Sequence, residues 1–318
     1  MRPLLPALGL CAGLYIVAIP FGNLIAAPKA TQQVIGLLVG ESQWLGEARK
    51  LAAKLDHEEG MRVVPMLGVG GVQAFQDMSS LPGIDAALVA SDSLAYASEQ
   101  GLLAGQKDKF SYIAKLAPLN VVIVAKREIA TLEGLKGKKI ATGPAQSASF
   151  ATAELLFNAL NIDFTRVAKQ DEEALDALNS GLADAAVILG TAQSTAVLSD
   201  GRFHVLDVQA PPSLSSVYQP AILTARELPG LVTGKQTVET ISTSLTLAVH
   251  EHVRDAGRNK ALKTFTSLVF NLPSPDGGDN LAAAVPGWQR HAEALKVLNQ
   301  KLATKKQAVT ISPTGGKP

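Results

Sequence analysis

The chain has few of the residues on which several classes of protein depend. Only 5% of its 318 residues are aromatic, and 29 basic and 28 acidic side chains leave a formal net charge of +1. Because the charges nearly cancel, the chain offers no net positive surface charge that would attract a polyanion. So few aromatic rings also argue against a surface on which nucleobases stack. We therefore predict no nucleic-acid partner.

Cysteine is nearly absent. The single residue, Cys11, lies in an apolar N-terminal stretch. If this stretch is removed during export, the remaining chain contains no disulfide and no thiol nucleophile.

Sequence signatures of enzymes and metal sites are missing as well. The loop from Gly68 to Gln73 lacks the last glycine of a dinucleotide fingerprint, and neither a P-loop nor a Gly-x-Ser-x-Gly elbow occurs. The run from His250 to Arg254 has arginine where a zinc-binding helix has its second histidine. We predict a protein that is not an enzyme, with no catalytic residue, no metal and no cofactor.

The first 30 residues have the order of an export signal. A basic start at Arg2 precedes an apolar run from Leu4 to Ile25, and small residues follow up to Ala30. This order predicts a signal peptide and hence a periplasmic protein. Because the apolar run is long, an uncleaved membrane anchor is the alternative. At the other end, residues 306–318 are polar and are predicted to form a disordered tail.

An internal echo is the most informative feature of the chain. A first unit opens at Val34–Gln43 and closes at Gly83–Asp92, and a second unit opens at Lys139–Ser149 and closes at Gly181–Gly190. Each unit reads as a strand, a loop of small residues, an amphipathic helix, a second helix and a buried strand. Two such α/β units predict two lobes with a cleft between them. Small ligands bind in clefts flanked by strand ends and helix N-termini.

The periodicity of apolar residues predicts the remaining elements. Residues 31–120 together with 251–305 are assigned to the first lobe, and residues 121–250 to the second. The chain then crosses twice between the lobes, which predicts a hinge. Strands are expected near Val34–Val39, Arg62–Met66, Ile84–Ala90, Val121–Ala125, Ile140–Thr142, Phe203–Val208 and Ile241–Val249, and the last two helices near Asn259–Leu268 and Gly287–Leu302.

The loop from Gly143 to Ser149 is a candidate anion site. Backbone N–H groups at the start of the following helix, with the hydroxyls of Ser147, Ser149 and Thr152, could hold a carboxylate. The alternative is that Ser149 only caps the helix.

Other candidate positions have structural alternatives of the same kind. Asp92 could accept a hydrogen bond from a ligand amine or cap the helix that begins near Ser93. Trp44 belongs either to the core or to the wall of the cleft. The glycines Gly68, Gly70 and Gly71 either make a tight turn or let the backbone approach a ligand closely.

Motifs along nearly the whole chain, from about Val34 to His291, resemble those of a known family. The most specific are Val238–Ile241 and Asn280–Trp288. The others are Leu51–Asp56, Met61–Gly68, Gly71–Gln73, Gly83–Asp85, Ser91–Asp92, Tyr112–Leu116, Leu132–Lys138, Gly143–Ser149 and Tyr218–Thr224. They resemble the TAXI-type solute-binding proteins of TRAP (tripartite ATP-independent periplasmic) transporters.

The resemblance implies an α/β fold of the two-lobed, type II periplasmic binding class, with a hinge and an interlobe cleft. It further implies that the cleft captures a small organic acid or amino acid, anionic or zwitterionic, and that the protein delivers it to the TRAP permease. By position, the implied ligand-binding residues are Ser42, Trp44, Gly71, Gln73, Ser91, Asp92, Gly143, Ser147, Ser149, Thr152, Thr191 and Tyr218.

The sequence departs from the pattern of that family in two loops. Ala148 and Ser149 stand where glycine and threonine are common, and Gln43 precedes Trp44 where a glycine is common. The β-carbon of Ala148 lies where the backbone would approach a ligand. A second function therefore stays open, in which a sensor or scaffold uses the same cleft to engage a membrane signalling partner.

Overall fold

The computed structural model describes residues 33–311, apart from 57, 170, 191–200, 235, 252–254 and 273–279. The predicted signal segment and Thr191 lie outside the described residues, as do residues 312–318. Residues 32–318 cluster as one compact unit. None of the described helices combines the length and the apolar character needed to cross a membrane.

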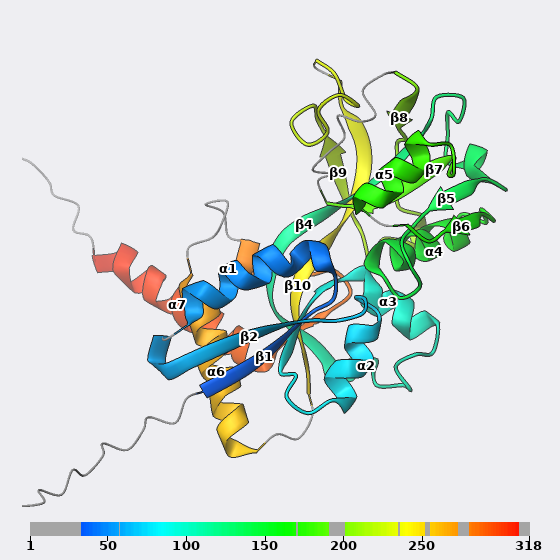
Figure 1. Ribbon diagram of the computed structural model, residues 1–318. Coiled ribbons are helices and arrows are strands. Elements are labelled where there is room, and N and C mark those ends of the chain that lie inside the picture. Colours follow the sequence, from blue (N-terminus) through cyan, green and yellow to red (C-terminus); the bar gives the residue numbers. More distant parts are fainter. Residues whose placement is uncertain are drawn as a thin grey trace, which may run out of the picture. The chain divides into compact units, whose positions relative to one another are not determined.

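One continuous sheet runs through the described residues, with its strands in the order β2-β1-β3-β10-β4-β7-β5-β6 (Figure 1). Strand β11 and strand β8 also pair with β4, and β9 pairs with β10. The strands are β1 (Gln33–Val39), β2 (Met61–Leu67), β3 (Ala86–Ala90), β4 (Phe110–Lys126), β5 (Lys139–Ala141), β6 (Thr165–Val167), β7 (Ala185–Leu189), β8 (Phe203–Val205), β9 (Gln219–Leu223), β10 (Val238–His250) and β11 (Gln289–Arg290).

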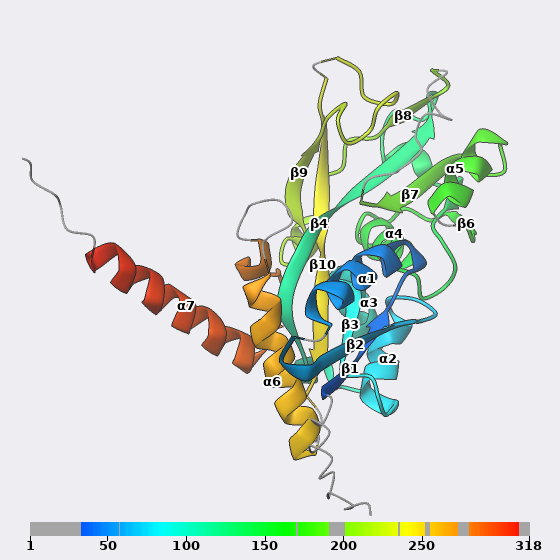
Figure 2. The ribbon, with the colours of Figure 1, turned by 60° about the vertical axis from the view of Figure 1, so that its left-hand side comes forward.

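Helices lie on both sides of this sheet (Figures 1 and 2). They are α1 (Leu45–Leu55), α2 (Gln73–Ser80), α3 (Asp92–Glu99), α4 (Ala148–Ala159), α5 (Asp171–Asn179), α6 (Ala256–Asn271) and α7 (Ala292–Ile311). Ala48, Ala52 and Leu55 recur at helical spacing in the sequence of α1, and all three are buried in the core.

Strands β4 and β10 carry the chain between the two lobes (Figure 2). They pair antiparallel from Phe110 opposite His250 to Asn120 opposite Ser242. Beyond this point β4 pairs with β7, from Val121 opposite Leu189. We call the part built on β1, β2 and β3 the first lobe, and the part built on β5, β6 and β7 the second lobe. The two crossings are thus neighbouring strands, as a hinge requires.

Strand β4 is much longer than the sequence predicted. The pattern indicated a strand only from Val121, whereas β4 begins at Phe110. Residues 110–120 include Lys115 and Pro118, which interrupt the apolar run that predicts a buried strand. Lys115 is nevertheless only 8% exposed, and it pairs in register with Thr246 of β10.

The internal echo has a geometric counterpart in two aspartates. Asp85 precedes β3, and its Oδ2 accepts a hydrogen bond from the N–H of Gly36 at 2.9 Å. Asp184 precedes β7, and its Oδ2 accepts from the N–H of Lys139 at 3.0 Å. Each aspartate therefore ties the entry of its buried strand to the opening strand of the same unit. Basic side chains complete both sites: Arg258 reaches Asp85 at 2.6 Å and Lys126 reaches Asp184 at 2.6 Å.

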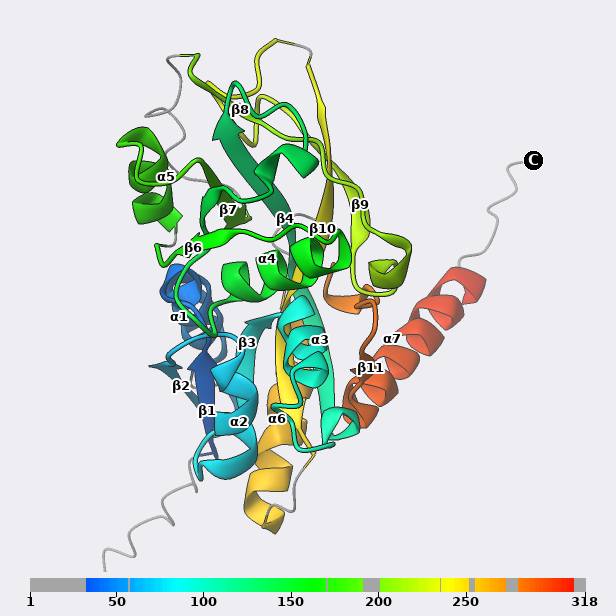
Figure 3. The same ribbon diagram turned by 90° about the vertical axis from the view of Figure 1, so that its right-hand side faces the viewer.

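Helix α4 is buried around most of its circumference. The apolar residues Ala153, Leu156 and Phe157 are buried, and so are Ala148 and Thr152. Helix α4 of the second lobe lies against α3 of the first (Figure 3), where Thr152 contacts Asp92.

The C-terminal helix differs from the prediction at both ends. It begins at Ala292 rather than near Gly287, because the preceding residues form a turn and the short strand β11. It continues to Ile311, past the predicted start of a disordered tail at residue 306. The helix formers Lys306, Gln307 and Ala308 continue the helix beyond residue 305, and the β-branched residues Val309, Thr310 and Ile311 make up its last turn.

The packing around Gly36 yields a testable consequence. A β-carbon on Gly36 would lie 1.8 Å from the carbonyl oxygen of Gly83, so Gly36→Ala must push two backbone segments apart. We expect this overpacking to cost about 1–3 kcal/mol of unfolding free energy, measured by urea denaturation. Gly46→Ala in α1 is the control, because a β-carbon there meets nothing within 4 Å. It should leave stability unchanged or raise it by up to about 1 kcal/mol. Equal stability of the two variants would contradict the close approach at Gly36.

Candidate ligand-binding site

Three loops meet where the two lobes face each other. The first follows β1 and contains Glu41, the second follows β2 and runs from Gly68 to Val72, and the third precedes α4 and runs from Gly143 to Ser147. Strands β1 and β2 are parallel, so their carboxyl ends deliver the first two loops to the same edge of the sheet. Loops at such an edge are the usual ligand-binding position of α/β proteins.

A buried carboxylate occupies the junction of these loops. Oε1 of Glu41 accepts a hydrogen bond from the N–H of Gly71 at 2.9 Å and another from the N–H of Ala148 at 2.7 Å. Glu41 is only 5% exposed. Since Ala148 is the first residue of the 12-residue helix α4, the carboxylate lies at a helix N-terminus, where backbone N–H groups and the helix dipole favour an anion. We call the N–H groups of Gly71 and Ala148 the carboxylate seat.

The predicted anion site therefore holds a carboxylate, but one supplied by the chain itself. Sequence reasoning singled out the seat and missed Glu41. The only signal for it was an acidic residue directly after a strand whose loop echoes the loop of the second unit. That signal does not reveal a contact with a residue 107 positions away.

A backbone contact ties the second and third loops together. The N–H of Val72 donates to the carbonyl oxygen of Gln146 at 3.0 Å. A β-carbon on Gly70 would lie 2.4 Å from the same oxygen, so only glycine permits this approach. Gln146 itself has a φ of 71°, a conformation that non-glycine residues rarely adopt and that often occurs at functional sites. The glycines of this loop thus serve a close approach between lobes.

Asp92 forms a second buried bridge between the lobes. It is fully buried, and its Oδ2 accepts hydrogen bonds from the hydroxyl of Thr152 at 2.6 Å and from that of Tyr218 at 2.9 Å. Asp92 is the first residue of α3, and its carboxylate points to these two hydroxyls, which corrects the idea that it caps the helix. The structure thus brings together three of the predicted residues, from segments far apart in the sequence.

Burial determines the proton affinity of this cluster. Removal from water raises the pKa of Asp92 above its ordinary value, although hydrogen bonds from Thr152 and Tyr218 oppose the rise. Burial also raises the pKa of Tyr218 well above its ordinary value, and the neighbouring Asp92 raises it further. Tyr218 therefore stays a neutral hydrogen-bond donor.

The capping role considered for Ser149 belongs to Ser147. Ser147, not Ser149, is the N-cap of α4, because its Oγ accepts from the N–H of Phe150 at 3.2 Å. Ser149 is the second residue of the helix, and its hydroxyl donates to the carbonyl oxygen of Thr142 at 3.0 Å. The cap falls on Ser147 because this residue is extended, with φ of −70° and ψ of 159°.

The remaining predicted residues are spread over several environments. The hydroxyl of Ser91 hydrogen-bonds to that of Thr243 at 2.8 Å, and the amide of Gln73 donates to Asp77 at 3.0 Å. Gly143 is buried at the end of β5, with a φ of 75°. Two predicted residues lie away from the seat: Ser42 is exposed, and Trp44 belongs to the hydrophobic core.

Three buried polar atoms around the seat have no hydrogen-bond partner among the described residues. They are Oδ1 of Asp92, Oγ of Ser93 and Oγ1 of Thr142. Unpaired polar atoms are rare in protein interiors because each costs free energy. Ser93 lies close to the seat, since its Oγ is 3.3 Å from where a β-carbon on Gly71 would be, and Oε1 of Glu41 is 3.5 Å from the same point.

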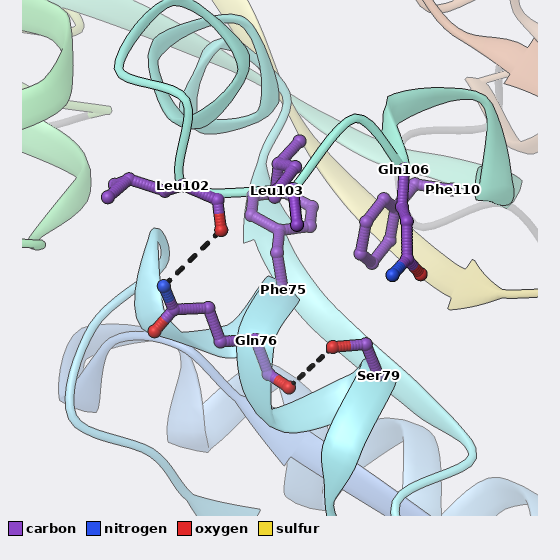
Figure 4. Close-up of a pocket in the computed structure, with 8 residues that line it drawn as sticks. Phe75, Gln76, Ser79, Leu102, Leu103, Gln106 and Phe110 are labelled. Carbon is purple, nitrogen blue, oxygen red and sulfur yellow. Dashed lines mark hydrogen bonds between the residues drawn. The ribbon is translucent and has the colours of Figure 1, made fainter.

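A separate small pocket of about 80 Å³ lies beside α2 (Figure 4). Leu102, Leu103 and Phe110 line it together with residues of α2. None of the predicted ligand-binding residues contributes to it.

The comparison with protein families decides the classification. The sequence pattern of the NMT1-like family matches residues 48–265, which is more than half of the chain. The chain belongs to the NMT1-like family. A search among curated proteins found no match. The match begins after Glu41 and includes Gly71, Asp92 and Ala148.

Solved structures confirm the predicted fold class. MatC from Rhodopseudomonas palustris, with bound malate, is 21% identical with a TM-score of 0.50, and the match covers 87% of this chain and 98% of MatC. The periplasmic binding protein BugD is 16% identical with a TM-score of 0.51, over 86% of this chain and 97% of BugD. At such low identity the likeness is one of fold. This NMT1-like chain thus has the two-lobed α/β fold of periplasmic binding proteins.

The raised pKa of Asp92 predicts an unusual dependence of stability on pH. The folded state binds the Asp92 proton more tightly than the unfolded state, so the contribution of Asp92 is full below its ordinary pKa of 3.8 and is lost as the pH rises through the folded pKa. Asp92→Asn keeps an acceptor for Thr152 and Tyr218 without the charge. We expect its unfolding free energy to gain on that of the wild type as the pH rises from about 4 toward neutrality, because the wild type must then pay for ionising a buried carboxyl group.

Asp184→Asn is the matched control for this prediction. Partial burial raises the pKa of Asp184, but the hydrogen bonds from Lys126 and from the N–H of Lys139 outweigh it, so that this pKa lies below its ordinary value. Its contribution is therefore present above its ordinary pKa and lost as the pH falls. The asparagine variant should lose stability relative to the wild type as the pH rises. Parallel pH profiles for the two variants, measured by urea denaturation, would contradict the assigned burial of Asp92.

Proposed function

We propose that this NMT1-like chain is the extracytoplasmic solute-binding component of a TRAP transporter, of the TAXI type, exported by its N-terminal segment. It captures a small organic acid or amino acid between its lobes and delivers it to the permease. One observation carries the proposal: the N-terminus of α4 and the N–H of Gly71 hold a carboxylate with two hydrogen bonds of 2.7 and 2.9 Å. A seat that binds a side-chain carboxylate also fits the carboxylate of a solute.

The groups around the seat fit the rest of such a solute. Oδ1 of Asp92 and the hydroxyl of Ser93 are buried polar atoms without partners among the described residues. A carboxylate beside the seat suits the ammonium group of an amino acid, and hydroxyls suit the polar groups of a hydroxy acid. MatC, which has the same fold, binds malate, a hydroxy acid with two carboxylates. This supports a solute of the proposed kind.

Binding requires the lobes to separate and close again. Glu41, Asp92 and Thr152 are at most 5% exposed, so a solute does not reach them from the surface while the lobes are joined. In the proposed cycle, the lobes open about β4 and β10, the solute enters, and its polar groups replace contacts between the lobes. The solute then shifts the equilibrium between open and closed forms by its preference for one of them.

The carboxylate in the seat belongs to the chain itself, and this favours a second function. Because Glu41 supplies it, the chain joins its own lobes through Ala148 and Gly71. A protein that closes in this way could act as a ligand sensor or scaffold, presenting its joined lobes to a membrane signalling partner.

A thermal-shift screen tests whether the folded protein binds a solute acid, as the transport proposal requires. Dicarboxylates, 2-oxo acids, hydroxy acids and amino acids would be tested against the purified protein. At 100 times its Kd, a solute that binds only the folded state adds about 2.7 kcal/mol of stability. For a chain of this size we expect a rise in Tm of about 5 °C.

The control for this screen lies in the solute. Each acid that raises the Tm is compared with its methyl ester or primary amide, which lacks the charge that the seat recognises. We expect the analogue without a carboxylate to give no shift at the same concentration. If no acid of the panel raises the Tm saturably, the transport proposal fails and the scaffold function, which needs no solute, gains support.

A further inference from the structure

The seat joins the two lobes through a single oxygen atom. Gly71 belongs to the first lobe and Ala148 begins α4 of the second, and both N–H groups point to Oε1 of Glu41. Glu41 itself follows β1 in the first lobe. Its carboxylate therefore spans the interface as a solute carboxylate would. The unpaired, fully buried Oγ of Ser93 lies beside it, within 3.3 Å of the point that a β-carbon on Gly71 would occupy.

The surroundings show that Glu41 and a solute carboxylate exclude each other. The same point next to Gly71 is 3.5 Å from Oε1 of Glu41 and 3.7 Å from the β-carbon of Ala148. The loops are also held together on the other side by the hydrogen bond from Val72 to Gln146. A second carboxylate beside the first would meet like charge in a buried site, which is strongly unfavourable.

We propose that Glu41 is an internal competitor, which occupies the carboxylate seat and holds the lobes together until a solute acid displaces it. The proposal rests on the solute site proposed above and assigns its regulation. Glu41 is tethered to the loop after β1, so its effective concentration at the seat is high and constant. The apparent affinity of a solute is reduced by the fraction of molecules in which Glu41 fills the seat.

This device makes the protein selective. A monoacid that offers only a carboxylate gains nothing that Glu41 does not already supply. An acid that also satisfies Oδ1 of Asp92, Oγ of Ser93 or Oγ1 of Thr142 gains contacts that Glu41 leaves unmade. The competitor therefore favours solutes with a second polar or charged group.

The first experiment measures the distance between the lobes. Spin labels are placed at Lys54 in α1 and Lys136 in the second lobe, both exposed, in the full-length chain with Cys11 replaced by serine. Without added acid, the wild-type background should show one narrow distribution of distances. Glu41→Ala should shift and broaden it toward longer distances, and Glu41→Gln, which keeps an acceptor oxygen but loses the charge, should lie between the two.

The control for this experiment is Glu47→Ala. Glu47 lies on α1 in the same segment, but its side chain is exposed and pairs with Lys50. Its removal should leave the distances unchanged. If Glu41→Ala and Glu41→Gln both keep the wild-type distribution, Glu41 does not hold the lobes and the proposal is overturned.

Acetate provides a chemical test of the seat itself. In Glu41→Ala, acetate matches the missing side-chain carboxylate and should restore the short distance, whereas acetamide should not. Adding Ala148→Pro should abolish this rescue, because proline lacks the N–H of the seat. The backbone tolerates proline here, since position 148 is the first of the helix and Ser147 is extended, with ψ of 159°.

Ala256→Pro is the matched control for the proline. Ala256 is the first residue of α6 and also follows an extended N-cap, Asp255, with φ of −62° and ψ of 163°. In the Glu41→Ala background this change should leave the acetate rescue intact. Equal loss of rescue in both proline variants, or no rescue by acetate at all, would overturn the assignment of the seat.

Affinity measurements separate this proposal from the function on which it rests. Any acid that responds in the thermal-shift panel should bind Glu41→Ala at least about tenfold more tightly than the wild type, by titration calorimetry. Unchanged or weaker binding would overturn the competition. If instead no acid of the panel binds either protein, but acetate closes Glu41→Ala, the proposed transport function fails while the role of Glu41 stands.

Discussion

The removal of a single carboxylate from water is the constraint on which the junction of the two lobes depends. Oε1 of Glu41 is held by one N–H group from each lobe, at 2.9 and 2.7 Å. A buried anion is tolerated only where donors surround it, and a helix N-terminus offers donors that the helix itself leaves unused. The start of α4 and the loop through Gly71 supply these donors, one from each lobe.

A second buried carboxyl group, that of Asp92, makes the junction between the lobes more polar. Asp92 accepts hydrogen bonds from Thr152 and Tyr218 and keeps one oxygen without a partner among the described residues. Removing these two carboxylates from water costs free energy whenever the lobes come together. Interfaces of this kind are less firmly held than apolar ones, which suits lobes that part and rejoin about β4 and β10.

The sequence predicted the local elements and their repetition well. The apolar runs of β1, β3 and β7 and the helical stripe of α1 are strong, short-range patterns, and the structure confirms them. Patterns failed where burial depends on distant segments. The sequence predicts β4 only from Val121 because Lys115 and Pro118 interrupt the apolar run before it. It offers Ser149 as a candidate cap of α4 because the extended backbone of Ser147 leaves no mark in the residue type.

The sequence by itself determined the two α/β units and the loops that carry the site, because each depends on residues close together in the chain. Only the tertiary structure decided what fills the carboxylate seat. Glu41 and Ala148 are 107 residues apart, and Asp92 and Tyr218 are 126 apart. Their pairing depends on how the two lobes meet, and no periodicity or motif encodes the distance between two atoms brought together by a long loop of chain.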